Sequence, residues 1–522
     1  MALKSLFASM ARRAALPQAD VVNEAGGRAY ALTPRQALAQ YAATGTLASG
    51  FYADAEAQLK NTLALAHAAD AEFLAKTAVY AFERGNMKDM PALLLAVLSQ
   101  KGDPESGELF EKAFKRVARN GKMLRNFVQI MRSGQTGRSS LGSRPKRLIR
   151  DWIDAASPVE ILRASVGADP SLADVVKMVH PKPQTPERAA LYGWLIGRPY
   201  DFGALPQVVK DFEGFKREIS GPVPDVPFQM LTSLPLKKAH WAQIARKAGW
   251  QMLRQNLNAF ARYGLFQEKG FTAMIAGRLS DRAEIRRTRL MPYQLMTTLD
   301  NVSPQVPLEV RKALNAALNV SLQNVPRFAG RIVVAPDVSG SMGSPVTGWR
   351  KGSTTVTRCV DVAGLMAAAF LRANPETLIL PFDHQVHQVD FGREAGIFET
   401  AKRLASYGGG GTNMAAPMEE LLKRKAKFDL LIFVSDNESW INGRSGPYPT
   451  AAMTIWSKLK QINPEAKMVC LDLQPSATTQ MKNAPDVLNL GGFSDQVFDV
   501  IASFAGSEDA DHWVSRIEEI VL

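Results

Sequence analysis

An aspartate and two serines at alternate positions follow a short apolar run of the chain. The run at 333–336 predicts a buried strand, and Asp337, Ser339 and Ser341 come directly after it. Because alternate residues point the same way, one carboxylate and two hydroxyls can converge at the strand's carboxyl end, where open α/β sheets bind their ligands. Oxygen ligands of this kind suit Mg²⁺ or Mn²⁺ rather than zinc. The spacing therefore predicts a metal site.

Two later segments add oxygen ligands of the same kind. Glycines at 408–411 precede Thr412, and the apolar run at 430–434 is followed by Asp436. If the three hydroxyls bind the ion directly while the two carboxylates act through water, few negative charges touch the ion. It would then remain electrophilic and bind an outside carboxylate, so the set favours adhesion over hydrolysis.

In this order the three segments resemble the metal-ion-dependent adhesion site of the von Willebrand factor A domain. The resemblance implies a bound divalent metal, with Mg²⁺ preferred and Mn²⁺ or Ca²⁺ as alternatives. The implied ligand set is Asp337, Ser339, Ser341, Thr412 and Asp436. The competing interpretation is a pair of serine-rich turns after two strands.

Length and composition indicate a multidomain protein without a membrane span. The chain has 522 residues, of which 46% are hydrophobic and 22% charged. It contains no apolar run of the roughly 18–20 residues that cross a bilayer. Its first residues lack the order of a secretory signal, so we expect a flexible start at 1–20 and a cytoplasmic location. Only two cysteines, Cys359 and Cys470, are present, which excludes a disulfide framework and a cysteine-based zinc site.

Charge divides the chain into two parts. Residues 1–330 carry 45 Lys and Arg against 28 Asp and Glu, whereas residues 331–522 carry 18 against 22. A basic part joined to a mildly acidic one points to a polyanionic partner for the first.

The apolar periodicity changes at the same boundary. The first part is helical in pattern almost throughout and suits a HEAT-like α-solenoid. Helices are expected at 59–69, 73–82, 91–99, 109–117, 122–131, 205–212, 241–263, 267–279, 292–298 and 308–322. The second part alternates strands with helices, which predicts a mostly parallel, doubly wound α/β sheet. Strands are expected at 332–335, 377–382, 385–389, 430–434 and 468–471, and helices at 360–372, 395–405, 417–425, 451–461 and 495–505.

One tract of the first part has an unusual charge. Between Lys112 and Arg150 there are twelve Lys and Arg and no Asp or Glu. Unopposed cations repel one another unless a polyanion neutralises them, so the tract indicates nucleic acid, with a solvated helix face as the alternative. Its members are Lys112, Lys115, Arg116, Arg119, Lys122, Arg125, Arg132, Arg138, Arg144, Lys146, Arg147 and Arg150. A second tract, from Arg278 to Arg289, includes Arg286 and Arg287 and could line the same path.

Catalytic patterns are missing from the sequence. It has six histidines and neither a hydrolase elbow nor a Walker loop. His384 and His387 are spaced by three in a strand-rich stretch, which would place the rings on opposite faces, so we do not expect a metal pair. Asp383 and Asp390 are interpreted as solvated loop charges. We expect no enzyme.

Together these features resemble the Ro autoantigen family, which joins a TROVE module to a von Willebrand A domain. The residues that carry the resemblance are the segments at 23–32, 146–152, 172–183 and 433–439, besides the A-domain motifs. The resemblance implies a ring of HEAT-like repeats at 21–328 closed by an A domain at 329–522. It also implies binding of small noncoding Y RNAs on the ring's outer surface and of single-stranded ends of misfolded RNA in its hole. Bacterial relatives are associated with exoribonucleases, including polynucleotide phosphorylase.

Carried over residue by residue, the resemblance implies RNA contacts at Arg163 and His180, the latter within Lys177-x-x-His180-x-Lys182. A second basic residue is implied near Gly167, and this sequence departs from the pattern there. We therefore predict a monomeric, noncoding-RNA-binding ribonucleoprotein subunit in RNA quality control, processing or decay. The alternative is a metal-dependent protein-adhesion scaffold whose helical part binds acidic proteins.

Overall fold

The computed structural model of the chain forms two units. It describes residues 16–45, 47–49, 51–288, 292–323, 325–349, 357–389, 396–441, 448–494, 496–506 and 513–522. Of the start expected to be flexible at 1–20, residues 1–15 lie outside this description, as do Arg289 and Asp390. One unit comprises Met1–Thr62 and Leu322–Arg516, and the other Leu63–Ser321 and Ile517–Leu522. Residues 21–62, expected in the helical domain, thus belong with the unit that contains Leu322–Arg516.

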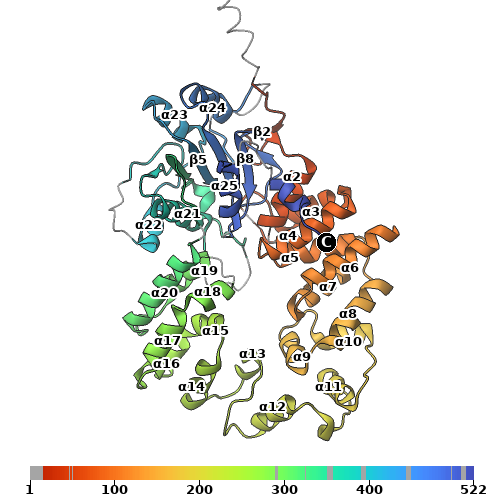
Figure 1. Ribbon diagram of the computed structural model, residues 1–522. Coiled ribbons are helices and arrows are strands. Elements are labelled where there is room, and N and C mark those ends of the chain that lie inside the picture. The colour runs from red at the N-terminus through yellow and green to blue at the C-terminus, as the bar shows by residue number, and fades with distance from the viewer. Residues whose placement is uncertain are drawn as a thin grey trace, which may run out of the picture. The chain divides into compact units, whose positions relative to one another are not determined.

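A five-stranded parallel sheet is the centre of the first unit (Figure 1). Its strands, in spatial order, are β4 Leu378–Ile379, β3 Ile332–Pro336, β5 Leu430–Ser435, β6 Lys467–Asp472 and β8 Val487–Gly491. Every residue of β3, β5 and β8 is buried, as expected for a sheet covered on both faces. The chain leaves β3 toward β4 and later returns on the other side of β3 as β5. The topological switch point therefore lies between β3 and β5.

The α/β fold predicted from the sequence is confirmed, with local differences. The helices of this part are α21 Cys359–Ala373, α22 Ile397–Leu404, α23 Ala415–Lys423, α24 Ala451–Ile462, α25 Gln496–Gly506 and α26 Trp513–Glu518, with a short 3-10 helix at Gly340–Gly343. The strand expected at 377–382 shortens to β4. The strand expected at 385–389 is wrong: only a single bridge joins Phe382 and Val386 there. Strand β8 was not predicted.

The N-terminal segment forms a small second sheet with residues of the α/β part. Strand β1 Val21–Val22 pairs with β2 Arg28–Ala31, which pairs with β7 Thr478–Thr479. Helix α2 Pro34–Thr44 follows, started by a capping box between Thr33 and Gln36. Gln40 on this helix is buried and donates through Nε2 to Oδ2 of Asp472 at 2.8 Å. Residues 21–44 are therefore an integral part of the α/β unit.

The second unit is helical throughout its described residues. After α3 Ala55–Ala68, which begins in the first unit, its elements are α4 Ala71–Glu83, α5 Asp89–Leu98, α6 Pro104–Val117, α7 Gly121–Arg132, α8 Ser143–Ala155, α9 Pro158–Ser165, α10 Leu172–Val179, α11 Pro186–Ile196, α12 Gln207–Arg217, α13 Phe228–Leu231, α14 Lys238–Lys247, α15 Trp250–Gln255, α16 Leu257–Arg262, α17 Phe271–Leu279, α18 Arg282–Thr288, α19 Pro292–Asn301 and α20 Leu308–Ser321, with 3-10 turns at Phe202–Ala204 and Leu265–Gln267. The repeat-like helical region expected from periodicity is confirmed, although the long helix expected at 241–263 divides into α14, α15 and α16.

Polar caps and apolar stripes explain these helices. Asp103, Asn120 and Ser157 each accept a backbone N–H three residues later, at the starts of α6, α7 and α9. Phe110 and Phe114 of α6 pack on Phe127 of α7, with ring centroids 5.9 and 5.3 Å from it. The opposite faces of α6 and α7 are left to charged residues. No helix in the described part of the chain combines the length and the apolar character that a bilayer crossing requires.

Candidate metal centre and candidate RNA interface

Two aspartates meet at the switch point of the sheet. In the β3–β5 register Pro336 lies opposite Val434, so Asp337 and Asp436 follow neighbouring strand ends. The backbone N–H of Asp337 donates to the carbonyl of Val434 at 2.9 Å. Both carboxylates are buried, with 0% and 2% of the residue exposed. The parallel pairing of the two strands therefore brings both side chains to one edge.

The two predicted serines join this pair. Ser339 donates its N–H to Oδ1 of Asp337 at 2.8 Å, and its hydroxyl lies 3.2 Å from that of Ser341. Ser341 and Asp436 are both buried at this edge. Ser435, which was not predicted, donates from Oγ to Oδ2 of Asp337 at 2.6 Å. Three of the five predicted ligands, Asp337, Ser339 and Ser341, are thus connected by hydrogen bonds.

The fifth predicted ligand, Thr412, is held beside them by the glycine loop. Gly409 donates its N–H to the carbonyl of Val338 at 2.8 Å, and Gly340 donates to the carbonyl of Gly410 at 2.9 Å. Gly408 has a φ of +79°, and a Cβ on it would lie 2.5 Å from Cγ2 of Val338, so only glycine fits there. The loop therefore packs directly on the Asp337–Ser341 segment, and Thr412 is buried at its end.

The electrostatics of this edge fit a divalent cation. Burial, and then the charge of Asp436, raise the pKa of Asp337, and burial likewise raises the pKa of Asp436. Burial and the charge of Asp436 also raise the pKa of Glu438 to about 8. Within the described ranges, no Lys, Arg or His forms an ion pair with Asp337 or Asp436. Two buried carboxylates beside three hydroxyls are the hard oxygen set that Mg²⁺ or Mn²⁺ binds, and a cation would relieve their repulsion.

Asp383 corrects two expectations. It is buried, not solvated, and its Oδ1 lies 3.0 Å from both Nδ1 of His384 and Nε2 of His387. The two rings are on the same side because this stretch turns instead of continuing as a strand. Oδ2 of Asp383 accepts the N–H of Gly410 at 3.1 Å. Burial opposes ionisation, but N–H donors from Gln385 and Gly410 and the nearby His387 hold the pKa of Asp383 below its usual value. Asp383 therefore anchors the glycine loop.

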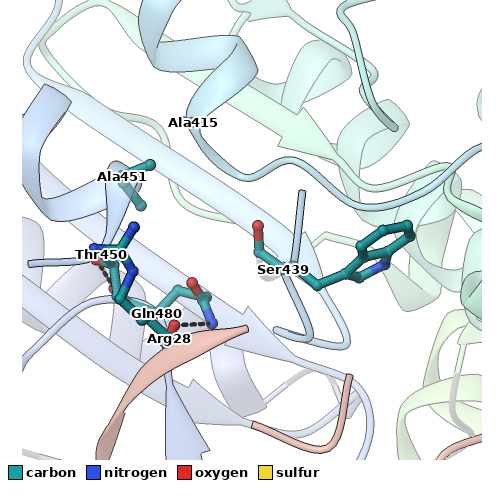
Figure 2. Close-up of a pocket in the computed structure, with 8 residues that line it drawn as sticks. Arg28, Ala415, Ser439, Thr450, Ala451 and Gln480 are labelled. Atoms are coloured by element: carbon teal, nitrogen blue, oxygen red, sulfur yellow. Dashed lines mark hydrogen bonds between the residues drawn. The ribbon is translucent and has the colours of Figure 1, made fainter. Parts of the chain in front are cut away.

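The N-terminal segment frames the other side of this edge. Asn23 donates to the carbonyl of Ser439 at 3.0 Å, and Ala25 donates its N–H to Oε2 of Glu438 at 3.2 Å. A small pocket opens next to Ser439, between the amino ends of α23 and α24 (Figure 2). In it Gln480 donates to the carbonyl of Arg28 at 3.2 Å. None of the five predicted ligands lines this pocket, so it is separate from the metal cluster.

The basic tract is less unopposed than its sequence indicates. Arg116 and Arg119 both bind Glu83 of α4, at 2.6 and 2.9 Å, and Arg144 and Arg147 bind Glu111. Arg147 also lies 3.7 Å from Asp151. The prediction of twelve cations without partners is therefore wrong for these four, because acids just outside the tract or on another helix reach them.

Other arginines of the tract donate hydrogen bonds to backbone carbonyls. Arg138 donates to the carbonyls of Ser140 and Leu141, and Arg150 to that of Lys146. Four further members of the tract, Lys112, Lys115, Lys122 and Arg132, are exposed and form no ion pair with the residues that the structure describes. Of the second tract, Arg286 and Arg287 are exposed on α18.

Arg125 occupies the place where a basic residue was expected. Its guanidinium donates to the carbonyls of Val166 and Pro170, and a Cβ built on Gly167 would lie 2.7 Å from its Nη1. The departure at Gly167 is thus accompanied by an arginine that reaches the same point from α7. A positive charge is therefore present there.

The remaining predicted RNA contacts lie on adjoining elements. Arg163 is in the last turn of α9 and Lys177 in that of α10, while His180 caps α10 in the left-handed conformation with a φ of +50°. Both helices pack on α7, where Gly121 lies against Ala164. Arg163, Lys177, His180 and Lys182 are all exposed. They form, with Lys122, a group of exposed basic side chains that we call the α7–α10 face.

Two exposed aromatic residues were missed by sequence reasoning. Tyr200 and Phe202, between α11 and α12, are 40% and 41% exposed, and the Arg217 guanidinium lies 5.5 Å from the Phe202 ring centre. Exposed rings next to cations can stack with nucleic acid bases. The sequence signal that could have identified them is the presence of two aromatic residues in a short segment between two helices.

Comparison with known proteins supports the resemblance seen in the motifs. Residues 331–505 match the family described as the Ro60 vWA domain. The chain is 24% identical to the RNA-binding protein RO60 of Deinococcus radiodurans, over 94% of this chain and 96% of that protein. It is 23% identical to the RNA-binding protein RO60 of Caenorhabditis elegans, over 48% and 39% of the two chains. The crystal structure of the Deinococcus radiodurans Ro (Rsr) protein matches 91% of this chain with a TM-score of 0.62 and 20% identity, which supports the fold.

Proposed function

We propose that this chain, which carries a Ro60-type von Willebrand A domain and resembles Ro proteins over most of its length, binds RNA through its helical unit. The observation that carries the proposal is the α7–α10 face, where basic side chains remain exposed, whereas Arg116 of α6 and Arg144 and Arg147 of α8 are paired with acids. Exposed cations release counterions when they bind phosphates. The names of the two relatives support the same function.

The RNA that suits this face is a small structured RNA of the Y type. His180 and Lys182 lie just beyond the end of α10, where they can contact a stem, and Arg125 supplies charge at Gly167. Single-stranded ends of misfolded RNA would bind elsewhere on the helical unit. The proposed role is RNA quality control by binding, without catalysis.

Three substitutions with a matched control test this proposal. Arg163→Gln, Lys177→Gln and Lys182→Gln together should weaken binding of a stem-bearing RNA by more than about tenfold and lower the dependence of log affinity on log salt by about 0.9 per lost contact. The control, Arg116→Gln, Arg119→Gln and Arg147→Gln, removes the same charge from paired positions and should change the affinity far less. Equal losses in both variants would show that only net charge matters.

We also propose that the edge of the A domain binds Mg²⁺. Asp337, Ser339, Ser341, Thr412 and Asp436 would hold the ion, which when bound supplies a positive centre able to attract a carboxylate. The buried carboxylates without basic partners support this assignment. The alternative function, metal-dependent adhesion to a protein, predicts that an acidic protein partner binds only with metal and that RNA does not bind.

A further inference from the structure

Residues 23–27 form a tight turn between β1 and β2, here called the 23–27 turn. The N–H of Asn23 donates to the carbonyl of Gly27 at 2.8 Å, and the N–H of Gly27 donates to Oδ1 of Asn23 at 2.6 Å. Gly26 has a φ of +83° and is exposed, whereas Asn23 is only 5% exposed. A buried polar side chain in an exposed turn indicates that the turn is bound to another part of the molecule.

The part that it binds is the loop after β5. Asn23 donates from Nδ2 to the carbonyl of Ser439 at 3.0 Å, across 416 positions of the chain. The N–H of Ala25 donates to Oε2 of Glu438 at 3.2 Å. A Cβ on Gly27 would overlap the carbonyl oxygen of Ser439, so this close approach requires glycine. The turn and the loop are therefore fitted to each other.

Both loop residues that the turn holds are hydrogen-bonded to proposed metal ligands. Ser439 donates from Oγ to the carbonyl of Thr412 at 3.3 Å and accepts on Oγ the N–H of Met414 at 3.1 Å. The N–H of Glu438 donates to Oδ1 of Asp436 at 3.4 Å. The turn thus reaches two of the five proposed ligands through one intervening residue each.

We propose that the 23–27 turn positions ligands of the A-domain metal site: Asn23 holds Ser439 and so orients Thr412, while Ala25 holds Glu438 and so orients Asp436. The inference rests on the proposed metal site. Residues that orient metal ligands without touching the ion change metal affinity by about 10–100-fold. The affinity of the site for a divalent cation therefore depends on a turn near the beginning of the chain.

Titration of the full chain with Mn²⁺, followed by electron paramagnetic resonance of the free ion, tests the inference. Asn23→Ala removes the bond to Ser439 and Gly27→Ala displaces its carbonyl, so each should raise the Kd for Mn²⁺ by about tenfold or more. The matched control is Gly26→Asn. Asn tolerates the left-handed conformation, and a Cβ at Gly26 would meet no atom within 4 Å, so the Kd should stay within about twofold of the wild-type value.

A second comparison separates positioning from a general loss of stability. Thr412→Ala lacks the hydroxyl that Asn23 is proposed to orient. Adding Asn23→Ala to Thr412→Ala should therefore raise the Kd by about threefold or less, because the effects of coupled residues do not add. Circular dichroism establishes that each variant is folded at the temperature of the titration.

The outcomes distinguish this inference from the metal site itself. Equal Kd values for wild type, Asn23→Ala and Gly27→Ala would overturn the inference and leave the metal site in place. Equal rises in Gly26→Asn and Gly27→Ala, or a fully additive effect in Thr412→Ala, would also overturn it, because the loss would then follow the stability of the turn. Absence of Mn²⁺ binding by folded wild type would overturn the metal site, and the inference with it.

Discussion

The predicted metal-binding edge of the sheet, where Asp337 and Asp436 lie, is here called the metal edge. It differs from the basic tract of the helical unit in how distance along the sequence relates to the role of a residue. At the metal edge, side chains almost a hundred positions apart, such as Asp337 and Ser435, are hydrogen-bonded in one buried cluster. In the basic tract, cations close in sequence have different roles: Arg116 pairs with Glu83, Arg125 holds a loop, and Lys122 stays exposed.

This difference shows which patterns can be interpreted without a fold. Parallel strands end at one edge, so residues after neighbouring strands converge whatever their separation along the chain. In a helical region, by contrast, the partner of each charged side chain depends on which other helices pack beside it. Counting charges in a tract therefore omits acids such as Glu83, which comes from another helix.

The sharpest test of the metal edge removes its first carboxylate. Asp337→Asn should weaken Mg²⁺ binding by more than about 100-fold, because it deletes the charge nearest the hydroxyls and the acceptor for Ser435. Thr412→Ala, which removes a single hydroxyl, should cost less. Isothermal calorimetry measures both.

Measuring RNA affinity with and without metal tests whether the two regions act independently. RNA affinity should be the same in EDTA and in Mg²⁺, since the α7–α10 face belongs to the other unit. Loss of RNA binding in EDTA, with the fold intact, would show that the metal serves the RNA site.

A second prediction concerns the buried acid behind the metal edge. Burial raises the pKa of Asp472 well above its usual value, against the donors Asn437 and Gln40. A raised folded-state pKa means that this group's stabilising contribution is present below about pH 4 and is lost as pH rises. Asp472→Asn imitates the neutral form, so its unfolding temperature should exceed that of wild type at pH 8 by a few degrees.

The control for Asp472→Asn is the same comparison of unfolding temperatures at acidic pH, where Asp472 of the wild type is protonated. Near pH 4 the two proteins should unfold at similar temperatures, measured by calorimetry in EDTA. A variant that is less stable than wild type at pH 8 would show that the ionised carboxylate and its donors stabilise the fold.

The smallest effect is expected in the basic tract. Glu83→Gln removes the partner of Arg116 and Arg119 and should lower the free energy of unfolding by about 1 kcal/mol or less, because the pair is partly exposed. The hydrogen bond from Arg116 lowers the pKa of Glu83, so the contribution is present above about pH 4.5 and is lost as pH falls through the lower folded-state value. Urea unfolding at pH 7 and pH 3 measures it. A larger loss at pH 3 than at pH 7 would contradict this assignment.

Much of the α/β unit could be predicted because its signals are local. The runs at 332–335, 430–434 and 468–471 became β3, β5 and β6, with no end shifted by more than one residue. Strands β1, β2 and β7 could not be predicted, because strands of two to four residues carry no periodicity and β2 and β7 pair across more than 400 positions. The position of His384 and His387 was wrong because the spacing argument assumed a strand.

By itself, the sequence determined which oxygen-bearing side chains follow the strand ends, the two fold classes and the excess of positive charge in the first part, since each depends on residue types at short, regular spacing. Only the tertiary structure decided that Glu83 and Glu111 neutralise part of the basic tract and that Arg125 reaches Gly167. These contacts join residues distant along the chain, and such proximity depends on how the elements pack, which residue types at local spacing do not specify.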